Sequence, residues 1–154
     1  MSERESAGDL FCSDRAERGS KKDTLHNIEA TGELVVNVVS EEPAAKMNVT
    51  SGEYPPEVDE FALSGLTLVA SEVVQAPRVK ESHVNMECRL MKIVPVSERP
   101  GGGCLVLGEV VRFHVDDAMM SEFAVDPDQL GAVGRMGGAT YSRTADRFEL
   151  ERPK

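Results

Sequence analysis

The sequence predicts a β-rich α+β domain, most simply a small antiparallel barrel with short peripheral helices. Two long segments, 84–96 and 104–115, are rich in β-branched and apolar residues, and a run of glycines lies between them. The segments around them carry helix-capping residues beside short apolar stretches. With 154 residues, the chain has the length of one domain with a real core.

The first predicted element is a short helix that begins near residue 21 and leads directly into a strand. Ser20 is expected as its N-cap, Leu25 and Ile28 share one face, and Gly32 supplies a left-handed C-cap. The β-branched run 34–39 predicts a buried strand. Because a helix N-terminus attracts anions, the lysines and threonine at this end suit a phosphate. An ordinary capped surface helix is the alternative, and spacing alone favours it.

The segments before and after this unit are predicted to contain short elements. Residues 1–22 are polar, and we expect them to be mobile apart from a short strand at 10–13. Pro43 suits the first turn of a helix that ends at the break 50–52. A second helical piece is expected at 58–65, followed by an extended stretch over 66–74.

Segments 84–96 and 104–115 predict the two strands of an antiparallel hairpin. In the first strand, apolar residues alternate with Asn85, Glu87 and Arg89, so we expect these three polar side chains on the outer face. The alternation changes phase near 91–92, which predicts a bulge. The glycines at 101–103 lie between two strands, so they predict a turn and not a nucleotide-binding loop.

The C-terminal third is predicted to contain turns, a loop and a last strand. Asp at 116 and 126 each begin a short helical turn, and 133–141 predicts a glycine-rich loop. In that loop Arg135 either binds an anion or is simply exposed. Tyr141 either stacks on a ring or closes the core, the more common role. Phe148 and Leu150 are expected in a final strand pair.

Composition excludes several classes of function. With 27 acidic against 17 basic residues, the net charge of −10 argues against a nucleic-acid binder and against an anionic membrane surface. The three cysteines are widely spaced, which predicts free thiols in a reducing cytoplasm and no metal site. No apolar run is long enough to span a membrane, so we expect a cytoplasmic protein. No catalytic pair or triad is visible, and the catalytic residues stay unknown.

The strongest functional signal is a series of five blocks between about residues 10 and 150. They are KKDTLHNIEATGELVVNVV, MNVTSGEYPPEVDEFALSGLT, APRVKESHVNMECRL, GGGCLVLGEVVRFHVDD and VGRMGGATYSRT. Together they resemble the flavin reductase-like, FMN-binding split-barrel proteins. This resemblance implies an antiparallel Greek-key split β-barrel of six strands and a homodimer. It also implies FMN near the subunit interface and hydride exchange with NADH or NADPH.

The resemblance also assigns candidate cofactor-binding residues. Those that match the phosphate-side segment are Ser20, Lys22, Asp23 and Thr24, and those that match a block near the flavin are Arg135, Gly138 and Tyr141. Glu109 and His114 match positions to which we assign no role.

Two blocks of the family pattern, similar to RPIALVST and NLAPFSFFN, are not found in this sequence. The second of them lines the flavin in family members and helps to hold its phosphate. The sequence thus resembles a member without its first part, with a flexible segment at 1–19, the split-barrel domain at 20–150 and a polar tail at 151–154. Two functions remain open: an NAD(P)H-dependent flavin oxidoreductase, or a truncated, non-catalytic split barrel that binds flavin weakly or not at all and serves as a ligand-binding or assembly module.

Overall fold

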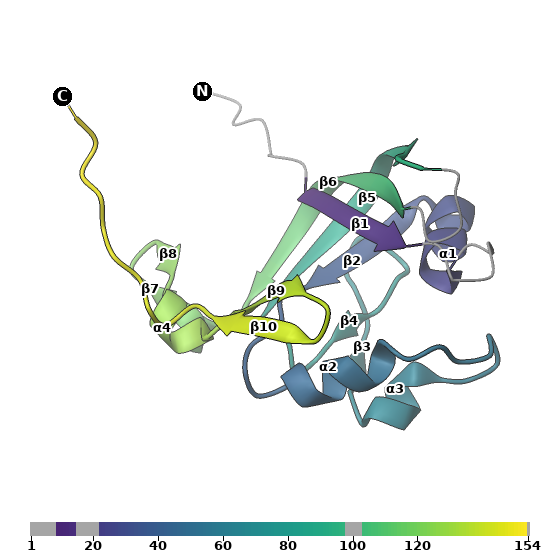
Figure 1. Ribbon diagram of the computed structural model, residues 1–154, viewed down its shortest axis with the longest axis horizontal. Coiled ribbons are helices and arrows are strands. Elements are labelled where there is room, and N and C mark those ends of the chain that lie inside the picture. Colours follow the sequence, from purple (N-terminus) through teal and green to yellow (C-terminus); the bar gives the residue numbers. More distant parts are fainter. Residues whose placement is uncertain (1–8, 15–21, 98–102, 154) are drawn as a thin grey trace.

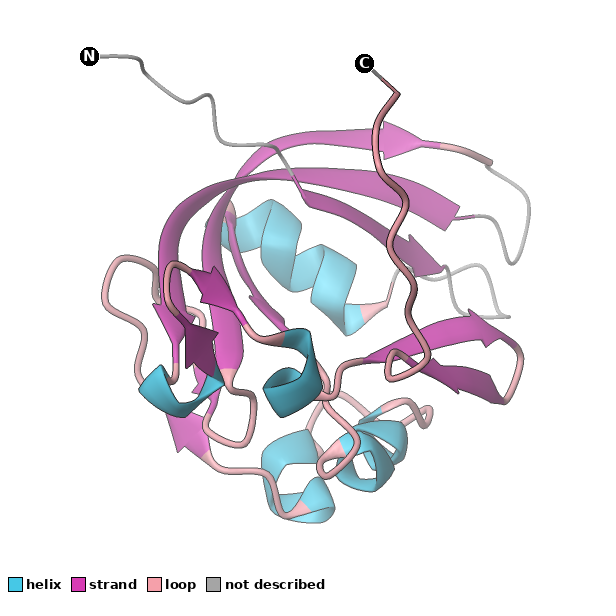
Figure 2. Ribbon diagram, turned by 90° about the vertical axis from the view of Figure 1, so that its left-hand side faces the viewer, coloured by secondary structure: helices cyan, strands magenta, loops and turns pink. Residues whose placement is uncertain are grey.

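The computed structural model describes residues 22–97 and 103–153, together with the backbone of residues 9–14. Its largest element is a four-stranded antiparallel sheet (Figure 1). The strands lie in the order β1 (Asp9–Asp14), β6 (Gly103–Val115), β5 (Val84–Pro95) and β2 (Glu33–Asn37). The sheet curves strongly and partly encloses one helix (Figure 2). Within the described ranges the sheet does not close into a barrel, and β1 and β2 form its edges.

The enclosed helix is α1 (Asp23–Thr31), which packs its apolar face onto the sheet as predicted. Leu25 and Ile28 are almost completely buried. Gly32 ends the helix with φ of 68°, the left-handed conformation that glycine adopts without steric cost. The helix residues meet a core drawn from three strands, made of Leu34, Cys88, Cys104, Val106 and Val110. The prediction of the N-cap was wrong: the helix begins one residue after Lys22, and Ser20 lies outside the described residues.

The predicted hairpin is confirmed as β5 paired with β6. The pairing shifts register between Leu90 and Lys92, where the change of alternation predicted a bulge. A second shift falls between Glu87 and Cys88. The glycine turn itself lies mostly outside the described residues, but the Val96 N–H donates to the Gly103 carbonyl at 3.0 Å and so closes the strand ends.

Two polar residues of β5 are not on an outer face as predicted. Asn85 is 4% exposed and Glu87 is completely buried. The reason is tertiary, because the segment 71–79 folds over this end of the strand and hydrogen-bonds to both side chains. Period-two alternation shows which residues share a face, but it does not show whether another segment covers that face.

Two short helices, α2 (Ala44–Thr50) and α3 (Glu60–Ser64), pack side by side beneath the sheet (Figure 1). The Asp59 carboxylate caps α3 by accepting the Phe61 and Ala62 N–H groups. The extended stretch predicted at 66–74 contains only the two-residue strand β3 (Leu68–Val69), which pairs with β4 (Arg78–Val79). The remainder is a loop held by side chains of the sheet.

The C-terminal third contains more strand than expected. After η1 (Asp117–Met119) come β7 (Met120–Ser121), β8 (Ala124–Val125), α4 (Pro127–Leu130), β9 (Val133–Gly137) and β10 (Thr140–Arg143). The predicted glycine-rich loop is therefore wrong, because β9 and β10 form a hairpin whose two-residue turn is Gly138 and Ala139, with positive φ at Gly138.

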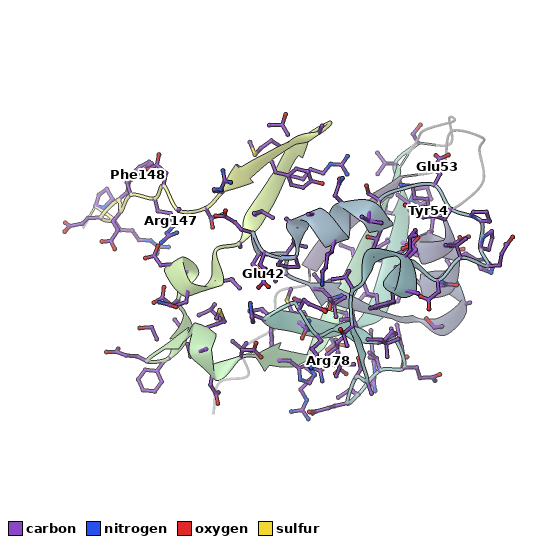
Figure 3. All side chains as sticks on the ribbon, turned by 90° about the horizontal axis from the view of Figure 1, so that it is seen from below. Glu42, Glu53, Tyr54, Arg78, Arg147 and Phe148 are labelled. Carbon is purple, nitrogen blue, oxygen red and sulfur yellow. The ribbon has the colours of Figure 1, made fainter. Side chains whose placement is uncertain are left out.

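The predicted last strand at Phe148 and Leu150 is also wrong. These side chains are 84% and 83% exposed and belong to no strand. The segment that carries them extends away from the sheet (Figures 1 and 3). It is attached near its base, where the Arg147 guanidinium hydrogen-bonds to the Thr144 carbonyl and to the Asp128 carboxylate of α4.

Candidate functional site

The N-terminus of α1 presents exposed polar groups, as the sequence suggested. Lys22, Asp23 and Thr24 are all exposed, and Lys22 at the N-cap makes no side-chain capping hydrogen bond. The first backbone donor that is paired inside the helix is the His26 N–H, which donates to the Lys22 carbonyl. The N–H groups of the first turn thus have no cap among the described side chains and suit an anion.

The second set of predicted residues lies on the β9–β10 hairpin. The Arg135 guanidinium donates to the Gly138 carbonyl at 3.2 Å and so bridges the turn of its own hairpin. Gly138, with φ of 54°, is needed for that turn. Tyr141 is 36% exposed, so the expectation that it closes the core is wrong.

Two hollows flank helix α2. The first, which we call the α3 hollow, has a volume of about 300 Å³ and lies among the end of β2, α2, α3 and β4. The second, which we call the hairpin hollow, has a volume of about 430 Å³ and lies between α2 and the β9–β10 hairpin. Met47 of α2 lines both, and Tyr141 lines the hairpin hollow. Both volumes fall at the low end of the range of small-molecule sites.

The structure brings only some of the predicted residues to a concave surface. Of the six that the structure describes, only Tyr141 lines one of these two hollows, and Ser20 lies outside the described residues. The Asp23 carboxylate at the start of α1 nevertheless acts on Glu60 of α3. Partial burial and the nearby Asp23 carboxylate together raise the pKa of Glu60, a residue of that hollow.

A buried carboxylate network, not foreseen from the sequence, is centred on Glu87 of β5 and joins the loop at 72–74 to β6. Glu87 accepts hydrogen bonds from the Glu72, Val73 and Val74 N–H groups at 2.7–3.0 Å. Its Oε1 also lies 2.6 Å from His114 Nε2. His114, to which the resemblance assigned no role, is thus a partner of Glu87, whereas Glu109 is exposed on β6.

The protonation of Glu87 follows from these contacts. Burial by itself raises the pKa of a carboxyl, but the backbone N–H groups of 72–74 and the His114 ring outweigh it and lower the pKa of Glu87 to about 2. Glu87 is therefore ionised at neutral pH and pins the loop 71–76 to the sheet. The network lines neither hollow, so it supports the fold and not a visible binding site.

Comparison with known families identifies the domain. The model of the flavin reductase like domain matches residues 10–134. The chain belongs to the flavin reductase-like family. A protein of Halalkalibacterium halodurans is 36% identical over 137 residues, which make up 88% of this chain and 66% of that protein. The chain thus spans slightly less than two thirds of the length of the curated relatives it matches first.

Solved structures of the flavin reductase-like family share the fold. Nitrilotriacetate monooxygenase component B from Bacillus cereus aligns with a TM-score of 0.84 and 34% identity, over 92% of this chain and 70% of that one. The 2-nitrobenzoate 2-nitroreductase NbaA of Pseudomonas fluorescens aligns with a TM-score of 0.79 and 30% identity, over 94% and 68%. A flavin reductase with a split-barrel domain from Shewanella frigidimarina has a TM-score of 0.78. These similarities confirm the split-barrel fold class.

Other kinds of site are less well supported in the described part of the chain. It contains no group of three or more potential metal-ligating His, Cys, Asp or Glu side chains. Among the same residues, no helix has the length and apolar character needed to cross a bilayer.

Proposed function

We propose that this chain is an FMN-binding flavoprotein of the flavin reductase type, which exchanges hydride between NADH or NADPH and flavin as a homodimer. The observation that carries the proposal is the family match over residues 10–134, which includes the exposed N-terminus of α1. When bound, FMN supplies the redox chemistry, and the protein binds and orients it.

The groups at the start of α1 fit a phosphate. The nine-residue helix directs its first N–H groups outward, where the helix dipole adds a partial positive charge. Lys22 adds an ammonium group and Thr24 a hydroxyl donor. Asp23 contributes its backbone N–H, since its carboxylate would repel a phosphate.

The hairpin supports the flavin-side assignment more weakly. Tyr141 lines a hollow large enough for part of a planar ring system and presents an aromatic side chain there. Arg135 and Gly138 are on the same hairpin, but neither lines that hollow. We therefore propose that Tyr141 contacts the flavin ring. Arg135 can contact the flavin only after its guanidinium leaves the hydrogen bond to the Gly138 carbonyl.

Binding and turnover are tested separately. The purified protein is mixed with FMN and desalted, and its visible spectrum is recorded. Flavin absorption that survives desalting supports binding, and oxidation of NADH or NADPH by this complex then supports the oxidoreductase. Bound flavin without such oxidation would instead support the non-catalytic split barrel.

The phosphate site is tested by comparing FMN with riboflavin, which has no phosphate. Loss of one charge-assisted hydrogen bond costs about 1.5–3 kcal/mol, or roughly ten- to a hundredfold in affinity. Lys22→Ala and Thr24→Ala should each weaken FMN binding by that factor and leave riboflavin binding nearly unchanged. Lys80→Ala, at an exposed lysine in the turn after β4, is the matched control. Equal binding of FMN and riboflavin by the wild-type protein would refute the phosphate site.

A further inference from the structure

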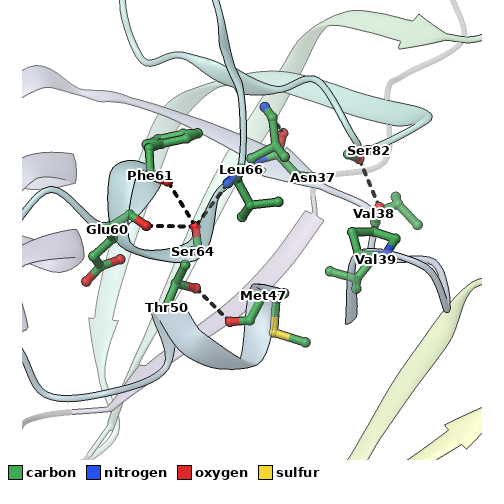
Figure 4. Close-up of a pocket in the computed structure, with 12 residues that line it drawn as sticks. Asn37, Val38, Val39, Met47, Thr50, Glu60, Phe61, Ser64, Leu66 and Ser82 are labelled. Carbon is green, nitrogen blue, oxygen red and sulfur yellow. Dashed lines mark hydrogen bonds between the residues drawn. The ribbon is translucent and has the colours of Figure 1, made fainter. Parts of the chain in front are cut away.

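The α3 hollow has an apolar lining contributed by several elements (Figure 4). Its apolar wall consists of Val38, Val39, Pro43, Met47, Phe61, Leu66 and Val79. Phe61 adds an aromatic ring and Met47 a polarizable thioether, and sulfur–aromatic contacts are favourable. The volume of about 300 Å³ exceeds the roughly 150 Å³ that admits benzene in an apolar protein cavity. The space is thus sufficient for one ring with a short substituent.

The hydroxyl groups around the hollow are already hydrogen-bonded within the protein. Ser64 Oγ lies 2.7 Å from the Glu60 carbonyl oxygen, and Thr50 Oγ1 lies 2.8 Å from the Met47 carbonyl oxygen. Ser82 Oγ lies 2.9 Å from the Val38 carbonyl oxygen (Figure 4). These hydroxyls therefore offer little to a charged ligand, which would lose water without gaining an ionic partner from them.

The acidic residue of the hollow does not change this preference. The Glu60 carboxylate extends away from the centre of the hollow, whereas its backbone carbonyl faces Ser64 (Figure 4). The Asn37 Oδ1 atom is also occupied, because it accepts the Val79 N–H at 3.0 Å and the Asn85 amide at 2.9 Å.

From these observations we propose that the α3 hollow is a binding site for the uncharged aromatic ring of a small molecule. Burial of apolar ring surface supplies the affinity, and contact with Phe61 and Met47 favours an aromatic ring over an aliphatic chain. The inference does not rest on the flavin proposal, because it uses only the lining of this hollow.

The wild-type protein provides the first test. Benzyl alcohol and benzoate, which differ mainly in charge, are titrated into protein labelled at the methionine methyl and phenylalanine ring positions. Benzyl alcohol should produce saturable NMR shifts at Met47 and Phe61, and benzoate should bind at least roughly tenfold more weakly. Benzoate binding as tightly as benzyl alcohol, or no saturable shift at these two residues, would overturn the proposal.

A variant that fills the hollow provides the second test. Val39→Phe adds a ring to the wall, so benzyl alcohol binding should fall at least tenfold. Val96→Phe is the control, since Val96 is 70% exposed and lines neither hollow. Unchanged affinity in a folded Val39→Phe protein would contradict the site. If that variant does not fold, the wild-type shift map decides the question by itself.

Discussion

Replacement of Glu87 by Gln is expected to destabilise the fold strongly, although the two side chains have nearly the same shape. The Glu87 carboxylate accepts three backbone N–H groups, from Glu72, Val73 and Val74, and contacts His114. A Gln amide has one acceptor oxygen where the carboxylate has two. In one orientation its NH₂ group would face the Glu72 N–H, and in the other it would face the Val73 and Val74 N–H groups.

The expected loss can be worked out from those contacts. One buried N–H left without an acceptor costs about 1–3 kcal/mol, and the remaining hydrogen bonds lose their charge assistance. The total is about 2–4 kcal/mol. The lowered pKa leads to a similar figure, because the change from 4.5 to about 2 corresponds to about 3 kcal/mol at 1.36 kcal/mol per unit.

The same reasoning fixes the sign of the pH dependence. The pKa of Glu87 is lower in the folded protein than its ordinary value of 4.5. Its contribution to stability is therefore complete above about pH 4.5 and is lost as the pH falls toward about 2. The gap in unfolding free energy between the wild type and Glu87→Gln should be largest at neutral pH and should close in this acid range.

Urea unfolding followed by circular dichroism at a series of pH values measures both effects. Glu109→Gln is the matched control, since Glu109 is exposed on the neighbouring strand, and its replacement should change the unfolding free energy by less than about 0.5 kcal/mol. The reasoning is refuted if Glu87→Gln stays within about 1 kcal/mol of the wild type at pH 7, or if the gap does not depend on pH.

Three further predictions concern other parts of the chain. Gly32→Ala should cost about 1–2 kcal/mol in unfolding free energy, because the position has φ of 68° although a Cβ there meets no atom within 4 Å; an unchanged urea midpoint would contradict this. Arg135→Ala should weaken FMN binding and leave the melting temperature nearly unchanged, since its bond to Gly138 is exposed; an equal loss of stability in the apo protein would mark Arg135 as structural. Because β1 and β2 are the edge strands of a sheet that does not close within the described residues, light scattering should find a dimer or larger species, and a stable monomer at micromolar concentration would count against it.

Much of the fold follows from local sequence patterns. The helix of Leu25 and Ile28, its end at Gly32 and the β5–β6 hairpin all depend on neighbours in the chain, and all are confirmed. The bulge after Leu90 is likewise visible in the sequence, since an extra residue reverses the alternation of apolar side chains. The order of five family blocks identified the family, and the match over residues 10–134 agrees with it.

What the sequence could not determine is the surroundings of individual side chains. Glu87 has the same period-two spacing as an exposed strand residue, and only the fold of 71–76 over β5 buries it. Tyr141 lines a hollow because α2, distant in sequence, packs opposite its hairpin. Arg135 contacts the turn carbonyl because 133–141 pairs as strands instead of forming a loop. Local patterns specify elements because their interactions are short in sequence, whereas burial and hollows depend on which distant segments pack together, and that is decided only in the tertiary structure.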